Sequence, residues 1–243
     1  MSLIDDRKCV EYQSKQFEKP KYSTIEFEKF LRENKCIRPN TRVLDIGAGG
    51  GDFIAFLAQK YPETRFLGVD YNKANVELGK KVMAEKGIKN VEMEAGDWFD
   101  LPESYAGKFD GILNVHTLCC FKRLDKALNA LVELNPRWIA FNSLFYEGPL
   151  DVLIHIRDHT RPELKDDDPD ADFNIFSLDV MRGLLAEGGY GIKFSRFNIP
   201  ASLPRPEEGK RGTYTVKTEF DKRAQFSGPV YLPWYFVLAQ KRK

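Results

Sequence analysis

Residues 42–53 read RVLDIGAGGGDF, a short apolar run that ends in an acid and then meets a cluster of glycines. Glycines after a strand let the backbone approach a ligand closely, because they carry no Cβ. In dinucleotide-binding folds that ligand is a pyrophosphate, and the fingerprint is GxGxxG. Gly47 and Gly49 match the fingerprint, but Asp52 stands at its third glycine. The loop therefore predicts a nucleotide-like ligand that differs from a dinucleotide.

The acid beside these glycines, Asp45, indicates the charge of the ligand. An ionised carboxylate would repel a doubly negative pyrophosphate and attract a cation. S-adenosyl-L-methionine carries an ammonium and a sulfonium and no phosphate, so it fits better. Asp70, at the end of the next apolar run, is expected to accept hydrogen bonds from both ribose hydroxyls; its alternative role is to cap the helix that begins near Asn72. Asp97 is expected to accept a hydrogen bond from the adenine amino group.

The elements that must position these acids alternate between strand and helix. Apolar runs typical of strands cover 42–46, 65–70, 90–95, 109–115, 137–144 and 232–240. Apolar residues at helical spacing cover 52–61, 72–87 and 123–134. This alternation indicates a parallel sheet with helices on both faces. A polar, helical segment over 1–38 is expected to precede it, with Ser23 or Thr24 capping a helix.

Ligands of such a sheet bind beyond the carboxyl ends of the strands. The residues predicted to bind the cofactor there are Asp45, Ile46, Gly47, Ala48, Gly49, Asp70, Tyr71, Gly96, Asp97, Trp98 and Asn114. Trp98 or Phe99 would lie against the adenine ring, although a loop tryptophan is equally often a core anchor.

Two long stretches, 145–176 and 199–230, interrupt the alternation. The second contains TYTVKTEF and KRAQF, which predict a hairpin. Long insertions on a parallel sheet tend to be functional. We expect one domain over residues 1–243, in which these two insertions cover the substrate side.

Composition limits the class of protein. With 37 basic and 36 acidic residues the net charge is +1, which argues against nucleic-acid backbone as the main partner. The apolar runs are too short to span a bilayer, and the first residues lack the apolar core of a secretory signal. The four cysteines show no zinc spacing, so free thiols in a reducing cytoplasm are the simplest interpretation.

Taken together, the motifs resemble those of the class I S-adenosylmethionine-dependent methyltransferases. VLDIGAGGGDF is similar to their glycine motif, LGVDYN to their ribose-binding acid and AGDWFDLP to their adenine-binding loop. FDGILNVHTL resembles their fourth strand and LPWYFVLAQ their last, antiparallel strand. The resemblance is strong over residues 40–145 and weak over the rest of the sheet. It implies a doubly wound, seven-stranded, mostly parallel sheet, and S-adenosyl-L-homocysteine as the product.

The histidines are the candidates for chemistry at the acceptor. His116 follows the fourth strand, where this fold brings the acceptor near the sulfonium, and could act as general base; a packed or water-facing ring is the alternative. His155 and His159 would share one face if LIHIRDH is helical, and with Tyr146 they are candidates for lining the substrate lid. A metal site built on the two histidines is the alternative, but no third ligand is evident.

The motifs do not identify the methyl acceptor. NVHT lacks the Asn/Asp-Pro-Pro-aromatic run of enzymes that methylate exocyclic amines of bases, and Asn114 and Asn142 stand where cation-dependent O-methyltransferases carry acids. No catalytic metal is therefore expected, and a near-zero net charge with two insertions favours a small-molecule acceptor. The alternatives are an RNA or protein methyltransferase that uses GKRGTY (209–214) as a contact, a nicotinamide-dependent reductase, and a non-catalytic adenosyl-ligand-binding protein.

Overall fold

The computed structural model describes residue 11 and residues 13–157, 173–207, 212–218 and 222–242. An eight-stranded sheet forms its centre, with seven strands in the order β3-β2-β1-β4-β5-β11-β7 and β6 paired with the end of β5. The strands are β1 (Arg42–Ile46), β2 (Arg65–Asp70), β3 (Val91–Ala95), β4 (Gly111–Val115), β5 (Trp138–Tyr146), β6 (Phe176–Ser177), β7 (Tyr190–Arg196) and β11 (Trp234–Lys241).

The direction of the strands confirms the predicted fold class. Neighbours from β3 to β5 run parallel, whereas β11 runs antiparallel to both β5 and β7. The carboxyl ends of β1, β2, β3, β4 and β5 therefore meet at one edge of the sheet, and β11 starts at that same edge, where Trp234 pairs with Leu144. This geometry brings the predicted site residues together.

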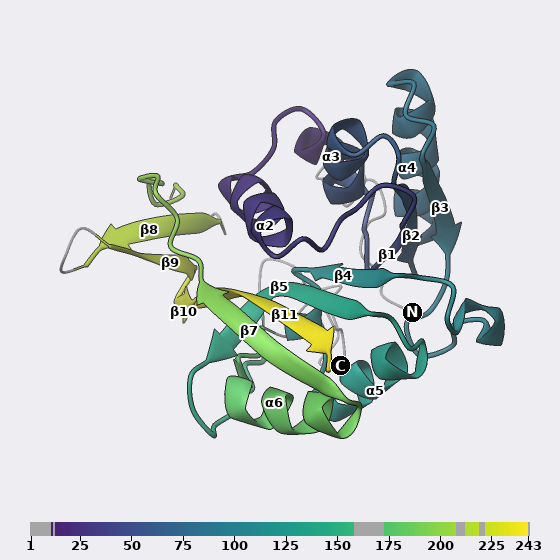
Figure 1. The fold of residues 1–243 in the computed structure, drawn as a ribbon. Coiled ribbons are helices and arrows are strands. Elements are labelled where there is room, and N and C mark those ends of the chain that lie inside the picture. Colours follow the sequence, from purple (N-terminus) through teal and green to yellow (C-terminus); the bar gives the residue numbers. More distant parts are fainter. Residues whose placement is uncertain (1–10, 12, 158–172, 208–211, 219–221, 243) are drawn as a thin grey trace.

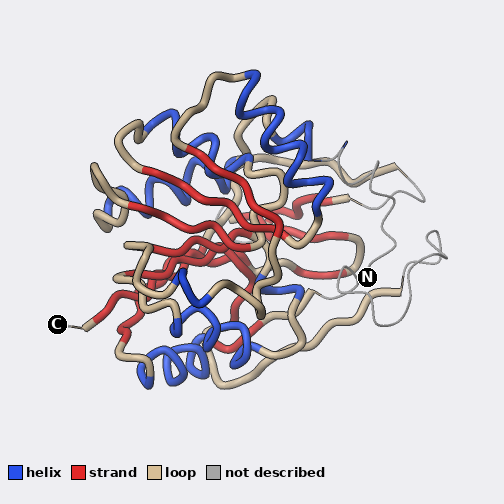
Figure 2. The backbone as a smooth tube through the Cα atoms, turned by 90° about the vertical axis from the view of Figure 1, so that its right-hand side faces the viewer, coloured by secondary structure: helices blue, strands red, loops and turns tan. Residues whose placement is uncertain are grey.

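Helices cover both faces of the sheet (Figures 1 and 2). One apolar cluster joins α2 (Tyr22–Glu33), α3 (Asp52–Lys60) and α4 (Lys73–Glu85) to one face, and another joins α5 (Leu124–Glu133) and α6 (Leu178–Glu187) to the other. Strand β5 is buried at every position except Tyr146, as expected for a strand covered on both sides. Short 3-10 turns occupy Glu103–Tyr105 and Leu118–Cys120.

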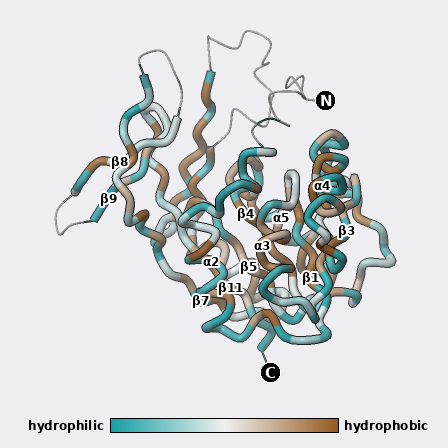
Figure 3. Tube along the Cα trace, turned by 90° about the horizontal axis from the view of Figure 1, so that it is seen from above, coloured by the Kyte–Doolittle hydropathy of each residue, from teal (hydrophilic) through white to brown (hydrophobic). Residues whose placement is uncertain are grey.

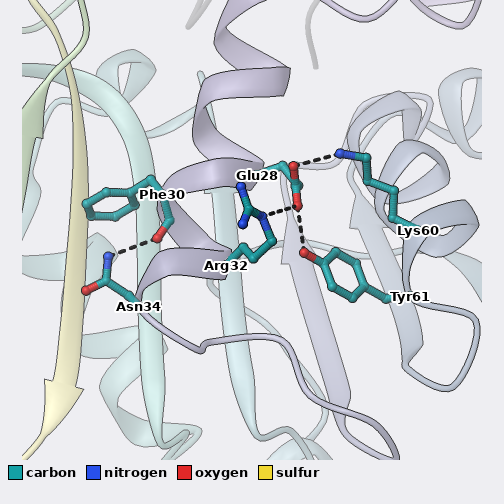
Figure 4. Close-up of polar contacts among 6 residues, drawn as sticks. All are labelled: Glu28, Phe30, Arg32, Asn34, Lys60 and Tyr61. Carbon is teal, nitrogen blue, oxygen red and sulfur yellow. Dashed lines mark hydrogen bonds and ion pairs between the residues drawn. The ribbon is translucent and has the colours of Figure 1, made fainter.

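A buried acid fastens α2 to α3 (Figure 4). Glu28 accepts hydrogen bonds from Lys60 (2.7 Å) and from the Tyr61 hydroxyl (2.6 Å), and it pairs with Arg32. Burial alone would raise the pKa of Glu28, but these partners lower it. The helix begins at Tyr22 after an N-cap that makes no side-chain hydrogen bond, so the expectation that Ser23 or Thr24 caps it is wrong.

The second long stretch contains the predicted hairpin. Strands β8 (Thr213–Lys217) and β9 (Arg223–Ser227) pair antiparallel, and β10 (Val230–Tyr231) adds a third strand. This small sheet lies at the end of the molecule opposite to α4 and β3 (Figures 1 and 3). Strand β7 lies outside every range that the sequence predicted for a strand; as a half-exposed strand at the sheet edge, it lacks a continuous apolar run.

The first long stretch leaves the end of β5 and returns beside it. Val152 and Ile175 form an antiparallel bridge, and Phe173 N–H donates to the Ile154 carbonyl at 3.0 Å. Within the described ranges, no helix has the length and apolar character needed to cross a membrane.

Candidate functional site

The glycine loop between β1 and α3 turns sharply at the carboxyl end of the sheet. The backbone N–H groups of Gly47 and Ala48 both donate to the Val69 carbonyl, at 2.8 and 3.1 Å. Gly47 and Gly49 have φ values of 71° and 56°, in the left-handed region that favours glycine. The loop is thus fixed against the end of β2.

Asp70 ties this loop to the second strand. One carboxylate oxygen accepts from Gly49 N–H at 2.7 Å and the other from Asn72 N–H at 3.0 Å. Burial raises the pKa of Asp70, and these bonds, together with one from the Asn75 side chain, oppose the rise. Asn72, not Asp70, caps α4, because its Oδ1 accepts from the first-turn amides. Asp70 therefore ties the glycine loop to the start of α4, and it remains the predicted acceptor for the ribose hydroxyls.

Asp45 is a fully buried acid in β1, next to the glycine loop. Its side chain is 1% exposed, and Oδ1 has no hydrogen-bond partner among the described residues. Burial raises the pKa of Asp45 well above its ordinary value of 3.8, and the charges of Asp52 and Asp70 raise it further. Burial raises the pKa of Asp52 as well. Three desolvated carboxyls around one loop suit a positively charged ligand, such as the amino-acid end of S-adenosyl-L-methionine.

The loop after β3 presents one acid and one aromatic ring to solvent. Asp97 is exposed, and its Oδ1 accepts from Phe99 N–H at 2.9 Å. Phe99 is 52% exposed. Trp98 instead lies in the core, with its Nε1–H donating to the Ala127 carbonyl at 3.1 Å. Of the two aromatic candidates for the adenine, the structure thus gives Trp98 a packing role and leaves Phe99 accessible.

Asn114, near the end of β4, and Thr117, just beyond it, hold the glycine loop from the other side. Asn114 is fully buried; its Nδ2 donates to the Ile46 carbonyl at 2.8 Å and its Oδ1 accepts from Leu118 N–H at 3.1 Å. Thr117 donates to the Gly47 carbonyl at 3.0 Å. A Cβ on Gly47 would lie 2.7 Å from Thr117. Asn114 is therefore a positioning residue, and Gly47 must lack a side chain for Thr117 to fit.

His116 is strained and tightly packed. It has a φ of 62°, unusual for a residue with a side chain, and its N–H donates to the Asn142 carbonyl at 2.8 Å. The Asn142 amide nitrogen lies 3.1 Å from Nε2, so Nε2 accepts and the ring proton is on Nδ1. The ring centre lies 4.4 Å from that of Trp234. Burial, aided by the charge of Lys21, lowers the pKa of His116 to about 3. With so low a pKa the ring is a weak proton acceptor at physiological pH, which weighs against a general base and favours an orienting role.

An apolar cluster lies beside His116 and joins both long stretches. Its buried members come from the turn after β4, from β5, from the return of the first stretch, and from the end of the second. They are Cys119, Leu144, Ile175, Val230, Leu232 and Trp234. Asn142 Oδ1 is a buried oxygen next to this cluster that has no hydrogen-bond partner among the described residues. The cluster thus packs the two long stretches against the ends of β4 and β5.

The remaining predicted residues lie as follows. Tyr71 is 57% exposed just beyond β2, and the Gly96 N–H donates to the Asp70 carbonyl at 3.0 Å. Tyr146 is 46% exposed at the end of β5. His155 is exposed on extended backbone, so the helical face proposed for it and His159 is not formed there.

His159 itself lies outside the described residues. Within the described ranges, no three His, Cys, Asp or Glu side chains gather as metal ligands would.

Sequence reasoning missed four residues of this site. Thr117 donates a hydrogen bond to the Gly47 carbonyl, and the Asn75 side chain donates one to Asp70. Gln13 accepts a hydrogen bond from Gly50 N–H, and the charge of Lys21 lowers the pKa of His116. The Gln13–Gly50 and Thr117–Gly47 bonds span 37 and 70 residues of chain. No local spacing pattern could have indicated contacts of that range.

Comparison with known proteins agrees with this geometry. Residues 37–154 match the family model described as "Methyltransferase domain". An uncharacterised protein of Rickettsia prowazekii is 43% identical over 105 residues, and EEF1A lysine methyltransferase 2 of Danio rerio is 32% identical over 104. A SAM-dependent methyltransferase from Aquifex aeolicus has the same fold, with a TM-score of 0.55 and 17% identity over 98% of both chains.

The two sequence relatives match only part of the chain. The matched residues are 42% and 43% of this chain, and 42% and 39% of the two relatives. The chain thus spans about two fifths of the length of those relatives. The family match ends at residue 154. It therefore includes the glycine loop and the ends of β2, β3 and β4, but it excludes most of the apolar cluster beside His116.

Proposed function

We propose that this chain, which carries a methyltransferase domain over residues 37–154, is a class I S-adenosylmethionine-dependent methyltransferase that transfers a methyl group from S-adenosyl-L-methionine to a small-molecule acceptor. The buried oxygen of Asp45, which has no hydrogen-bond partner among the described residues, supports a fit between these residues and the cofactor. Asp45 and Asp52 would hold its ammonium, Asp70 its ribose, and Asp97 with Phe99 its adenine. When bound, the cofactor supplies a methyl group on a sulfonium, which is an already activated leaving group.

The chain's own task is then alignment and exclusion of water, which can supply most of the rate of such a displacement. Asn114 and Thr117 fix the glycine loop, and the His116–Trp234 pair sits where the loop meets the apolar cluster. The neutral His116 ring and Asn142 would orient the acceptor through hydrogen bonds. No proton needs to be taken by His116 for an acceptor that enters unprotonated.

The single observation that carries the small-molecule assignment is the apolar cluster beside His116. It is built from segments far apart in the chain and is closed by buried side chains such as Leu232 and Ile175, each at most 8% exposed. An acceptor that reaches His116 must therefore be small or present a slender apolar group.

A second candidate is a basic side chain of a protein. EEF1A lysine methyltransferase 2 is among the relatives, and residues 145–176 carry nine acidic residues against three basic ones. A segment of this composition would attract a cationic partner.

The test is to incubate the protein with methyl-labelled S-adenosyl-L-methionine and a cell extract separated into small-molecule, protein and RNA fractions. We expect label in the small-molecule fraction, and none with the Asp70→Ala variant. Label confined to protein or RNA would contradict the small-molecule acceptor and favour one of the alternatives. No transfer to any fraction, with cofactor binding intact, would indicate a non-catalytic adenosyl-binding protein.

A further inference from the structure

The small sheet formed by β8, β9 and β10 carries a row of three aromatic rings on one face. Tyr214 on β8 stands directly opposite Phe226 on β9, which in turn stands opposite Tyr231 on β10. Residues that are directly opposite in a sheet share a face, so the three side chains lie on the same side. The ring centres are 5.5 Å apart for the first pair and 5.6 Å apart for the second. The row therefore crosses all three strands.

This aromatic face is turned away from the core. Within the described residues, the three half-buried rings belong to none of the apolar clusters that hold the central sheet and its helices together. Val216, which shares the face, is 40% exposed. Val230, on the opposite face, is instead a buried member of the cluster beside His116. The small sheet is thus fastened to the molecule by one side and leaves the aromatic side accessible.

An arginine stands at each end of the aromatic row. The central carbon of the Arg205 guanidinium lies 4.9 Å from the centre of the Tyr214 ring. Arg196, at the end of β7, donates a hydrogen bond to the Tyr231 hydroxyl. Both arginines are exposed. The rings offer surfaces on which nucleobases stack, and the arginines offer charged donors for phosphate groups.

The charge of this part of the chain differs from that of the whole. Residues 190–231 hold eight basic and four acidic side chains, whereas the complete chain has a net charge of only +1. On the opposite face of the small sheet, Lys217 and Arg223 stand directly opposite each other, although like charges in that position weaken a strand pair. Such a concentration of positive charge attracts a polyanion.

We propose that the aromatic face of the small sheet binds single-stranded RNA. Its bases stack on the rings of Tyr214, Phe226 and Tyr231, while Arg196 and Arg205 contact phosphates. Stacking requires unpaired bases, which the loops and bulges of RNA supply and a duplex does not. This surface goes beyond the proposed function, because it lies outside the cofactor site and needs no particular methyl acceptor.

The experiment is fluorescence anisotropy with a labelled, mixed-sequence RNA of about 12 nucleotides, a length that one small β module can cover. The comparison ligands are DNA of the same sequence and the corresponding RNA duplex, each titrated between about 50 and 200 mM salt. We expect the wild-type protein to bind the single-stranded RNA more tightly than either comparison ligand, with an affinity that falls as salt rises.

Two variants separate stacking from charge. Phe226→Leu keeps an apolar side chain but removes a ring, so RNA affinity should fall roughly tenfold while its salt dependence stays the same. Arg205→Gln should lower both the affinity and the slope of log affinity against log salt, the slope by about 0.7 for one phosphate contact. The matched controls are Tyr22→Leu, an exposed ring on α2, and Arg182→Gln, an exposed arginine on α6 that pairs with Asp179. Neither control should change RNA binding.

Several results would overturn the inference. These are no binding of the RNA by the wild-type protein, equal affinity for the duplex, equal or tighter binding of the DNA, and an effect of Phe226→Leu no larger than that of Tyr22→Leu. Thermal unfolding shows whether each variant is folded, and Arg205→Gln, which changes an exposed side chain, serves as the test if Phe226→Leu is not. Calorimetry with S-adenosyl-L-homocysteine tests the cofactor site separately. RNA binding without binding of that ligand would support this surface while the proposed function fails.

Discussion

The two halves of the sheet are held together in different ways. In the cofactor half, β1 to β4 with their loops, parallel neighbours pair in regular register, and the glycine loop is bonded to the end of the adjacent strand. In the acceptor half, β5 to β11 with the two long stretches, side chains make distant connections. Asn174 bonds to Ile154 and Phe121, and Asp151 bonds to Ser177.

The proposed function accounts for the difference through what each half would bind. The proposed cofactor would contact acids and glycines that stand together at strand ends, so short motifs carry that half. An acceptor pocket needs only a suitable shape, and many side chains can build one. We therefore expect substitutions to separate the halves: those in the first should change cofactor binding, and those in the second should leave it intact.

The largest effect is expected from Asp70→Ala. It removes the proposed acceptor of the ribose hydroxyls and frees the Gly49 N–H, so affinity for S-adenosyl-L-homocysteine should fall by more than about a hundredfold in calorimetry. Asp125→Ala, which removes an exposed acid paired with Arg123 on α5, is the matched control and should bind normally. An Asp70→Ala protein that binds within about threefold of wild type would remove Asp70 from the site.

The next largest effect is expected from Trp234→Ala, compared with Trp138→Ala. Trp234 begins β11 and pairs with Leu144 near the end of β5, whereas Trp138 begins β5. Both rings are buried, so each change should lower the free energy of unfolding by about 3 kcal/mol in denaturant titration. Only Trp234→Ala should also abolish methyl transfer to the small-molecule fraction, because Trp234 packs on His116. Both folded variants should bind S-adenosyl-L-homocysteine. Equal loss of transfer in the two variants would point to stability alone.

Asn174→Ala should have a smaller effect, confined to the acceptor half. It leaves the Ile154 N–H and the Phe121 carbonyl without partners, at a cost of about 1–3 kcal/mol. Hydrogen exchange should rise over residues 152–156 and 173–175 while cofactor affinity stays constant. Asn34→Ala, which removes one bond to Phe30 at the end of α2, is the control. Faster exchange across β1 and β2 in the Asn174 variant would show that the halves are not separate.

The smallest effect is a pH dependence that should belong to the cofactor half. Because the pKa of Asp45 is raised in the folded state, the folded protein binds a proton more tightly than the unfolded chain does. The ligand-free protein should therefore lose stability as pH rises from 3.8 through the raised pKa. A bound cation favours the ionised carboxyl, so S-adenosyl-L-homocysteine should release protons on binding.

Calorimetry in two buffers of different ionisation enthalpy measures that proton release. Asp45→Asn should lower it. Equal release from the variant and the wild type would assign the proton to another group.

The sequence predicts the first half far better than the second. Asp45, Gly47 and Asp70 stand next to strand ends whose apolar runs are unmistakable, so both the fold and the loop could be foreseen. The connection of Asn174 to Phe121, 53 residues earlier, leaves no local pattern. The same holds for Gln13, whose partner lies 37 residues away. The sequence does not decide whether Trp98 is buried or contacts the adenine, because its burial depends on which helix covers the loop. In the structure that helix is α5, where the Ala127 carbonyl accepts from Trp98.

The most direct test of the central claim, that the acids of the glycine loop bind a cationic adenosyl cofactor, is calorimetric titration of the wild-type protein with S-adenosyl-L-homocysteine, with NADH as the control. We predict saturable binding of S-adenosyl-L-homocysteine and none of NADH, because the desolvated carboxyls of Asp45 and Asp52 repel a pyrophosphate. Binding of NADH without binding of S-adenosyl-L-homocysteine would contradict the charge argument and the function built on it.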